Sequence, residues 1–358
     1  MNATLPATPD VLAAIASQLR VLDAHTYELR GQAVPVTYPQ AYTRWHQPLG
    51  QFGQNTGDDH QDRAQLLACL TQVLYGTYYC TGSTSAPTPP ALALPLPAAR
   101  QTCIERLSAA NQTADGFDPA WTVYAVDAHG TAWVTKNGQL RSLAPGQWEP
   151  AGPGEAPTPH VGAVVRLRIS REDRTAQPVF YHVRSRAVLP AQASLVRVYI
   201  NITFEGAVAL VEALTGTFNR YRLPFMFKCL NHPALYTRAD SAVLYLDKFD
   251  FNLAARLLPA IFEPLRPELQ AVGPLFTRGL LPGVSFSEDP GQGQSFGMSR
   301  CTLLAEALVN AHDKHLPTLA DALAEMRRAI TKSGLDETHF YRNPNSHFPY
   351  DFARLGAA

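Results

Sequence analysis

The chain has no excess of charge of either sign and few cysteines. Lysine plus arginine and aspartate plus glutamate tie at 30 each among 358 residues, so no overall field draws it to nucleic acid or to an anionic membrane. The five cysteines are odd in number and scattered, and no Cys-x-x-Cys pair occurs, which argues against a disulfide framework and a zinc site. Any anion binding must therefore come from a local cluster of side chains.

Two kinds of hydrophobic segment are also missing. The first residues, MNATLPATPDVLAAIASQL, lack the basic start and the sustained apolar stretch of a signal peptide. No run approaches the roughly 20 apolar residues that a membrane-spanning helix needs. We therefore expect a cytoplasmic protein that does not act at a membrane.

Two stretches rich in Pro, Gly, Ser and Ala, 81–99 and 142–160, are typical of linkers. They divide the chain into a helical amino-terminal region (1–80), a middle unit of linkers with a small β-hairpin (81–160) and a larger domain (161–358). No internal repeat is present.

The amino-terminal region is expected to hold helices at 9–23 and 62–75, each with an aspartate near its first turn. An aromatic and polar loop, 42–59, lies between them. In the middle unit, strands 122–126 and 131–135 flank a turn that ends at Gly130, which favours a hairpin.

The last domain alternates strands with helices, which predicts an α+β fold with a mixed or antiparallel sheet and flanking helices. Five segments rich in β-branched and aromatic residues are the expected strands: 163–169, 178–185, 195–202, 223–230 and 241–247. Apolar residues at helical spacing predict helices at 206–219, 299–313 and 317–332.

The third of these strands has two unlike faces. Because side chains alternate along a strand, Val196, Val198, Ile200 and Ile202 form one apolar face. The opposite face carries Arg197, Tyr199 and Asn201. Either this face is simply exposed to solvent, or it forms part of a site.

The fourth strand favours a site. Lys228 stands alone in the otherwise hydrophobic segment LPFMFKCL, and a charge in such a setting is costly unless it is paired or functional. The amine could instead reach solvent at the end of the strand. If the third and fourth strands are neighbours, Lys228 faces Arg197 and Tyr199 across the sheet.

Two further segments add positive charge. In YTRADSAVLYLD, Arg238 precedes the fifth strand and Tyr245 lies within it, although Asp240 could pair with Arg238 locally. The Gly-rich run DPGQGQSFGMSR leads into a helix expected to start near Ser299 and Arg300. Such a loop presents free N–H groups and a positive helix end, but glycine also simply marks turns.

Together these side chains suit a bound phosphate. Three arginines, Arg197, Arg238 and Arg300, can each fork onto two of its oxygens. Lys228 then stands apart as a candidate base, because burial and neighbouring positive charge both lower the pKa of a lysine.

The strings RVYIN, PFMFKCL and YTRADSAVLYL resemble the Hop-type domain of plant-pathogen type III effectors. Related domains serve as the lyase component of class V lanthipeptide and thioviridamide-like synthesis systems. The likeness covers about 160–332, and the family is in turn similar to phosphothreonine lyases, in which a lysine removes the α-proton and phosphate is expelled.

The resemblance implies a role for each matched position. It places the base on Lys228, a basic phosphate-binding residue on Arg197, and the later arginine and tyrosine on Arg238 and Tyr245. It also places a phosphate-holding arginine at the start of a helix on Arg300.

The acid is where this sequence departs from those lyases. They have histidine where the third strand has Tyr199, whose ordinary pKa near ~10 suits the protonation of a leaving phosphate less well. His182 could supply the proton if its strand lies next to the third; otherwise it is a histidine of the core.

The leading hypothesis is a phosphoserine or phosphothreonine lyase that converts a phosphorylated peptide to dehydroalanine or dehydrobutyrine. It needs no metal, nucleotide or redox cofactor, but it requires a separate kinase, since no kinase signature occurs here. The alternatives are a module that binds a phosphopeptide or an acidic partner without reacting, and a structural protein whose cationic face is an oligomer interface.

Overall fold

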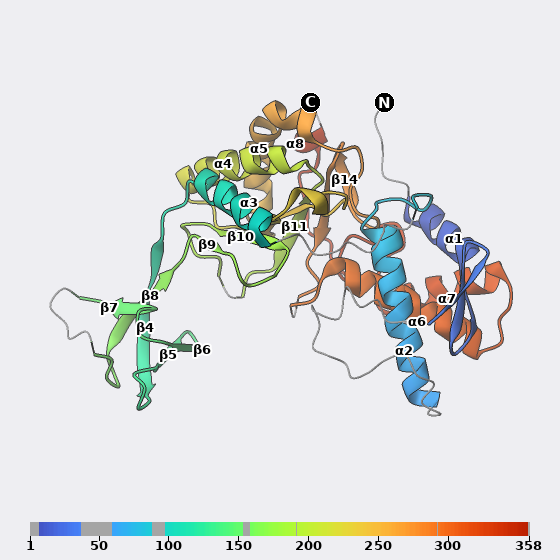
Figure 1. The fold of residues 1–358 in the computed structure, drawn as a ribbon, viewed down its shortest axis with the longest axis horizontal. Helices are drawn as coiled ribbons and strands as arrows, with labels where there is room; N and C mark the ends of the chain where they lie inside the picture. The colour runs from blue at the N-terminus through green and yellow to red at the C-terminus, as the bar shows by residue number, and fades with distance from the viewer. Residues whose placement is uncertain are drawn as a thin grey trace.

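A computed structural model describes residues 7–36, 59–87, 97–152, 158–190, 192–291 and 293–356. The loop expected at 42–59 lies almost entirely outside these residues. The described chain combines helices with three antiparallel sheets, as the predicted α+β class requires (Figure 1).

The largest sheet has seven strands in the order β14-β15-β11-β13-β12-β10-β9, and every neighbouring pair is antiparallel. The strands are β9 (Glu172–Asp173), β10 (Phe180–Arg184), β11 (Leu195–Ile200), β12 (Met226–Leu230), β13 (Ala242–Asp247), β14 (Arg278–Leu281) and β15 (Val284–Glu288). This sheet carries the polar face that the sequence indicates.

The apolar face of this sheet packs on three helices, α3 (Pro97–Ala110), α4 (Phe204–Arg220) and α5 (Phe251–Phe262), which lie side by side above it in Figure 1. Val196, Val198 and Ile200 are buried in this core, as the alternation of the strand predicts. The short helices η2 (Pro233–Leu235), η3 (Glu263–Glu268) and α8 (Ala353–Gly356) complete the region.

The third and fourth expected strands are not neighbours, because β13 lies between β11 and β12. β11 and β12 are each antiparallel to β13 and hence parallel to one another. Parallel strands need a long crossover connection, here α4, and this crossover leaves a gap that the later strand fills.

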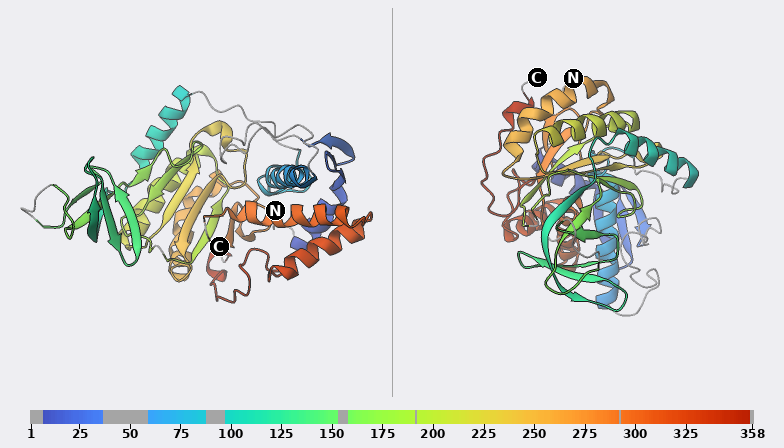
Figure 2. Two further views of the ribbon diagram at one scale, coloured as in Figure 1. Left: turned by 90° about the horizontal axis from the view of Figure 1, so that it is seen from below. Right: turned by 90° about the vertical axis from the view of Figure 1, so that its left-hand side faces the viewer.

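A second core joins the amino-terminal region to the helices α6 (Phe296–Asp313) and α7 (Leu319–Lys332). The amino-terminal region contributes α1 (Thr8–Gln18), the sheet β1 (Leu19–Asp23), β2 (Thr26–Leu29) and β3 (Gln32–Pro35), α2 (Asp59–Val73) and the π-helix η1 (Leu74–Tyr79). Figure 2 shows α2 beside α6, which packs in turn against α7. The helix expected at 9–23 therefore ends at Gln18, where the paired strands begin.

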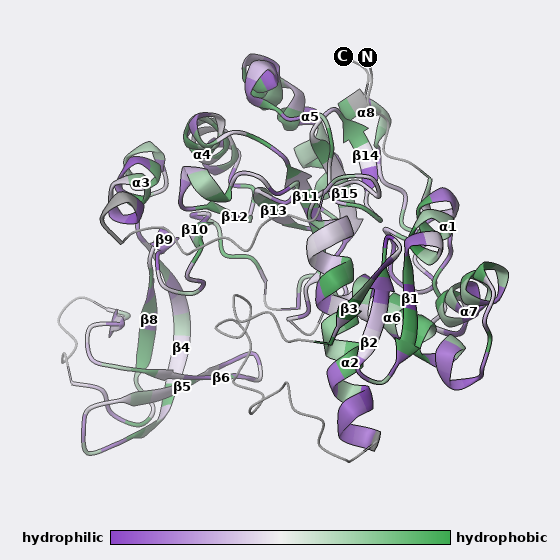
Figure 3. Ribbon diagram, turned by 45° about the vertical axis from the view of Figure 1, so that its right-hand side comes forward, coloured by the Kyte–Doolittle hydropathy of each residue, from purple (hydrophilic) through white to green (hydrophobic). Residues whose placement is uncertain are grey.

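A small five-stranded sheet stands apart from the rest of the chain in Figure 3. Its order is β6-β5-β4-β8-β7, with β4 (Gly116–Val126), β5 (Ala132–Lys136), β6 (Gln139–Leu143), β7 (Trp148–Pro150) and β8 (Val164–Ile169). The strand expected at 163–169 in the main sheet is β8 and belongs here instead, because Val165 and Leu167 complete a separate core around Trp121.

The amino-terminal region and α6 meet the main sheet in a tight aromatic contact. Tyr79 of η1 packs against Tyr199 of β11 and Phe296 of α6, with ring centroids 6.5 and 6.3 Å away. Gly297 lies under the Tyr79 ring so closely that a Cβ atom at this position would overlap it.

We expect Gly297→Ala to lower the free energy of unfolding by about 1–3 kcal/mol, because the new methyl group displaces the buried Tyr79 ring. Gly216→Ala in α4 is the matched control. The nearest atom to its new Cβ is 4.0 Å away, so alanine should be neutral or stabilise the helix by up to about 1 kcal/mol. Urea unfolding of both variants checks this, and equal stability of the two would contradict the packing described.

Candidate functional site

The polar face of the main sheet arranges its side chains in two rows across the strands. The first row crosses four neighbouring strands and consists of Ser287, Arg197, Tyr245 and Met226. In the second, two residues further along, lie Ser285, Tyr199, Val243, Lys228 and His182. Lys228 therefore shares a face with Arg197 and Tyr199, although β13 separates their strands.

A cavity of about 1040 Å³ lies over the first row, on the face of the sheet opposite the helices α3, α4 and α5. The sheet forms its floor, the loop after β15 forms one wall, and the segment 343–350 forms another. Side chains with charged or titratable groups on its lining include Arg197, Lys228, Tyr245, His182, Lys248 and Asp289.

Lys228 is held in surroundings that favour the neutral amine. Its Nζ donates to Gln177 Oε1 at 3.1 Å and lies 4.3 Å from the ring centroid of Phe180. Burial, and next the positive charge of Arg197, lower the pKa of Lys228 to about 8. At pH 7 roughly a tenth of this lysine is therefore a free base, far more than for an ordinary lysine.

Arg197 forms the cationic part of the floor. Its Nε donates to Asp289 Oδ2 at 2.7 Å and its Nη2 to the carbonyl oxygen of Gln294 at 2.6 Å. The ring of Tyr245 lies between the two cations, with Arg197 Cζ 5.2 Å and Lys228 Nζ 5.9 Å from its centroid. Because a guanidinium has five N–H groups, Arg197 retains donors beyond these contacts.

His182 lies directly opposite Lys228 and lines the cavity. Its strand, β10, is next to β12 and not next to β11 as the sequence analysis required. Burial and the charge of Lys228 lower the pKa of His182 to about 4, so the imidazole is neutral. Its buried Nε2 has no hydrogen-bond partner among the described residues.

Tyr199 and Asn201 share this face but do not line the cavity. Tyr199 is 2% exposed beneath Phe296 and Tyr79, and burial raises the pKa of its hydroxyl. The side chain of Asn201 donates to the carbonyl oxygen of Val272 at 2.7 Å.

Arg238 also lies off the cavity. Its guanidinium forks onto Asp240 with two contacts of 2.8 Å and donates to the hydroxyl of Tyr75 at 3.0 Å. The local pairing with Asp240, one of the two possibilities that the sequence leaves open, is therefore the arrangement present.

Arg300 supports a wall of the cavity from behind. It donates to the carbonyl oxygens of Phe340 (3.0 Å) and Arg342 (2.7 Å), directly before the lining segment 343–350. Burial lowers the pKa of Arg300 to about 10. The helix expected to start near Ser299 begins a turn earlier, at Phe296, so Gln294 and Ser295 reach the cavity instead.

Of the predicted site residues, the structure thus brings Arg197, Lys228, Tyr245 and His182 together in the cavity. Tyr199, Asn201, Arg238 and Arg300 are not among its lining residues. The sequence analysis missed Lys248, Asp289 and the segment 343–350. Lys248 directly follows β13, one of the expected strands, so an end-of-strand signal existed for it. Asp289 follows β15, which was not among the five expected strands. The position of 343–350 has no local signal, because it depends on contacts with Glu288 and Arg300.

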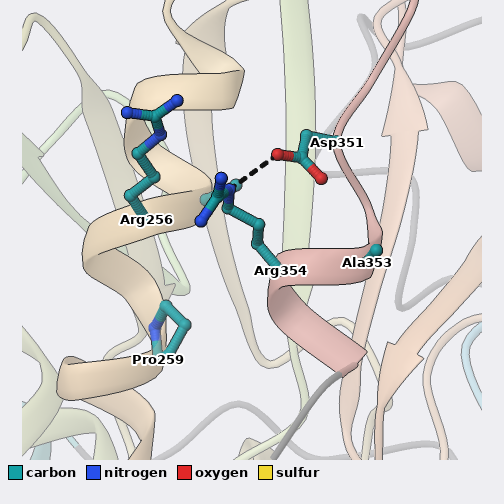
Figure 4. A pocket seen from close by; sticks show the side chains of 6 residues that line it. Arg256, Pro259, Asp351, Ala353 and Arg354 are labelled. Carbon is teal, nitrogen blue, oxygen red and sulfur yellow. Dashed lines mark hydrogen bonds and ion pairs between the residues drawn. The ribbon is translucent and has the colours of Figure 1, made fainter.

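A smaller cavity lies between α5 and α8 (Figure 4). Arg354 is paired there with Asp351 at 2.8 Å, and the exposed Arg256 stands nearby. It contains none of the predicted site residues. Across the residues that the structure describes, no group of three metal-ligating side chains occurs and no helix is long and apolar enough to cross a membrane.

The fold and the cavity together define an α+β protein with a cationic pocket on one face of an antiparallel sheet. Residues 172–342 match the model of the HopA1 effector protein family, which supports the predicted Hop-type domain. The matched region begins after β8, in agreement with the place of that strand in the small sheet. The description of the family names effectors and no chemical reaction.

Two solved effector proteins of Pseudomonas syringae are similar to the chain. The protein from pv. tomato strain DC3000 is 15% identical with a TM-score of 0.44, and the comparison covers 78% of this chain and 90% of that one. The protein from pv. syringae strain 61 is 16% identical with a TM-score of 0.44, covering 79% and 91%. No curated protein matches the chain.

The lowered pKa of Lys228 can be tested without a substrate. We expect the rate at which an amine-reactive reagent labels Lys228 to rise through a midpoint near pH 8, against ~10.4 for an ordinary lysine. Arg197→Gln should move the midpoint upward, because it removes a positive charge and leaves Asp289 unpaired. Peptide mass spectrometry gives the labelled fraction, and Arg256→Gln serves as the control. A midpoint near 10 in the unmodified protein would contradict the arrangement.

Proposed function

We propose that the chain is a lyase that eliminates phosphate from a phosphoserine or phosphothreonine residue of a peptide. The observation that carries the proposal is a lysine with a pKa lowered to about 8, beside a buried arginine, in a cavity open to a large ligand. The motif resemblance to the lyase component of lanthipeptide-type systems supports the same reaction.

The reaction needs a base and a site for the leaving group. Neutral Lys228 takes the α-proton of the phosphorylated residue, the electrons of that C–H bond form the Cα=Cβ double bond, and the Cβ–O bond breaks. The products are phosphate and dehydroalanine from phosphoserine, or dehydrobutyrine from phosphothreonine. No electron is transferred to a cofactor at any step.

Arg197 is the proposed phosphate-binding residue. Its ion pair with Asp289 holds the guanidinium in place, and its remaining N–H groups stabilise the charge that develops on the leaving oxygen. The start of α6, near Ser295 on the cavity lining, adds N–H groups and the positive end of a helix. The hydroxyl of Tyr245 completes the proposed substrate contacts from the floor.

Arg238, Arg300 and Asn201 act in this proposal as positioning residues and not as direct phosphate ligands. Each donates to groups of the chain itself: Asp240, the carbonyl oxygens before segment 343–350, and the carbonyl oxygen of Val272. Their contacts hold the strand ends and the wall that shape the cavity.

A separate kinase would have to supply the phosphorylated peptide, since the chain carries no kinase signature. The size of the cavity accommodates several residues of an extended peptide in addition to the reacting one. The proposed reaction requires no metal, nucleotide or redox cofactor.

Lys228→Arg should abolish elimination while leaving phosphopeptide binding within about threefold. Arginine keeps the positive charge, but its pKa above ~12 prevents it from accepting the α-proton. Loss of a general base costs about 10²–10⁴-fold in rate. The assay follows the mass lost as phosphoric acid from a phosphothreonine peptide, beside a binding isotherm for the same peptide.

Arg256→Lys, in the smaller cavity, is the control and should retain full activity. Normal turnover by Lys228→Arg would exclude Lys228 as the base. Binding without elimination by the unmodified protein would instead identify a phosphopeptide-binding module.

The acid can be identified by comparing His182→Gln with Tyr199→Phe. We expect the histidine variant to lose more activity, because His182 lines the cavity with an unpartnered Nε2 and a bound phosphate dianion favours its protonated form. The loss should be on the order of 10²-fold in kcat, with less than tenfold for Tyr199→Phe. The reverse order would return the role of acid to the tyrosine predicted from the sequence.

A further inference from the structure

Lys248 is a cation at the mouth of the cavity that the proposed reaction does not use. It directly follows β13, and its backbone N–H donates to the carbonyl oxygen of Ser194 at 2.8 Å. Its Nζ lies 5.1 Å from the ring centroid of Phe249 and 5.6 Å from that of Phe348. These two rings hold the amine at the rim of the cavity without neutralising its charge.

The acidic side chains of the cavity wall do not pair with Lys248. Glu288 accepts hydrogen bonds from the backbone N–H of Asn343 (2.6 Å) and the hydroxyls of Ser346 (2.5 Å) and Tyr350 (2.7 Å). Asp289 is bound to Arg197. Within the described ranges, Lys248 forms no ion pair with any carboxylate. An ammonium group is therefore available at the rim to an anion from outside the chain.

The register of the sheet gives the distance between this amine and the proposed reaction centre. Lys228 lies opposite Val243 and Arg197 lies opposite Tyr245, both on the strand that ends just before Lys248. At about 3.3 Å per residue, Lys248 is about 10 Å beyond the row of Arg197 and about 16 Å beyond the row of Lys228. An extended peptide covers this distance in roughly three to five residues.

We propose that Lys248 forms a second anion subsite, which binds an acidic side chain, aspartate or glutamate, three to five residues from the phosphorylated residue of the substrate. This inference rests on the proposed function for its phosphorylated residue. It adds the substrate class: a peptide whose phosphorylated residue has an acidic neighbour at a set distance along the chain.

The experiment uses phosphonate analogues of phosphothreonine peptides, because their C–P bond cannot be eliminated and binding is measured without turnover. Each peptide carries a single Glu, Lys or Ala at one position from three to five residues on either side. We expect Glu at one of these positions to tighten binding about two- to fivefold over Ala, as for a partly exposed ion pair, and Lys to weaken it.

Charge reversal at the rim tests the assignment. Lys248→Glu should invert the preference, so that the Lys peptide binds more tightly than the Glu peptide at the same position. Lys332→Glu makes the same change at an exposed site in the last turn of α7 and should leave the preference unaltered. A preference that Lys248→Glu does not change, or no preference at any position, would overturn the subsite.

Two further arms separate the possible failures. A second phosphothreonine in place of Glu tests which kind of anion the subsite binds. If this phosphate tightens peptide binding and Glu does not, the assignment to a carboxylate is overturned. Elimination from authentic phosphothreonine peptides is measured in parallel. If elimination is absent but the binding preference follows the charge at position 248, the lyase proposal fails and the subsite stands. If elimination proceeds and the preference is missing, the subsite alone fails.

Discussion

The buried ion pair between Arg197 and Asp289 is the contact on which the cavity depends. It connects the floor strand β11 to the loop that leads into α6, and Arg197 also binds the carbonyl oxygen of Gln294 in that loop. The side chain of Asn343 donates to the backbone carbonyl of Asp289, so the same residue anchors the wall segment. Removing one partner of such a buried pair costs about 3–5 kcal/mol, because the other charge is left without compensation.

The same pair tunes the chemistry that we propose. Arg197 carries its charge at a fixed position beside Tyr245, where it lowers the pKa of Lys228, while Asp289 partly offsets that effect. If the Arg197 side chain were free to move, its average distance from Lys228 would be larger and its effect on the lysine pKa would be smaller. The contact that builds the cavity therefore also contributes, after burial, to the lowered pKa of the proposed base.

The amino-terminal residues are a structural part of this site. Tyr75 and Tyr79 of the π-helix contact Arg238 and Tyr199, so a segment more than a hundred residues earlier packs on the polar face near the end of β11 and just before β13. Residues 116–169 behave differently, since their five strands form a sheet with a core of its own around Trp121. Between them these two regions account for most of what lies outside the match to the effector family.

Alternation along the chain determined which residues face which way. The two-residue period of a strand puts Val196 and Val198 on one face of β11 and Arg197 and Tyr199 on the other. It likewise turns Lys228 away from the face of Phe227 and Cys229. This period is a property of the local sequence. The order of the strands depended on tertiary structure, because the α4 crossover and the insertion of β13 involve contacts between distant residues. Only the folded chain decided that Arg238 is bound to Asp240, that Arg300 supports a wall, and that Lys248 reaches the rim. Long side chains can serve several partners, and the partner that lies within reach is a property of packing.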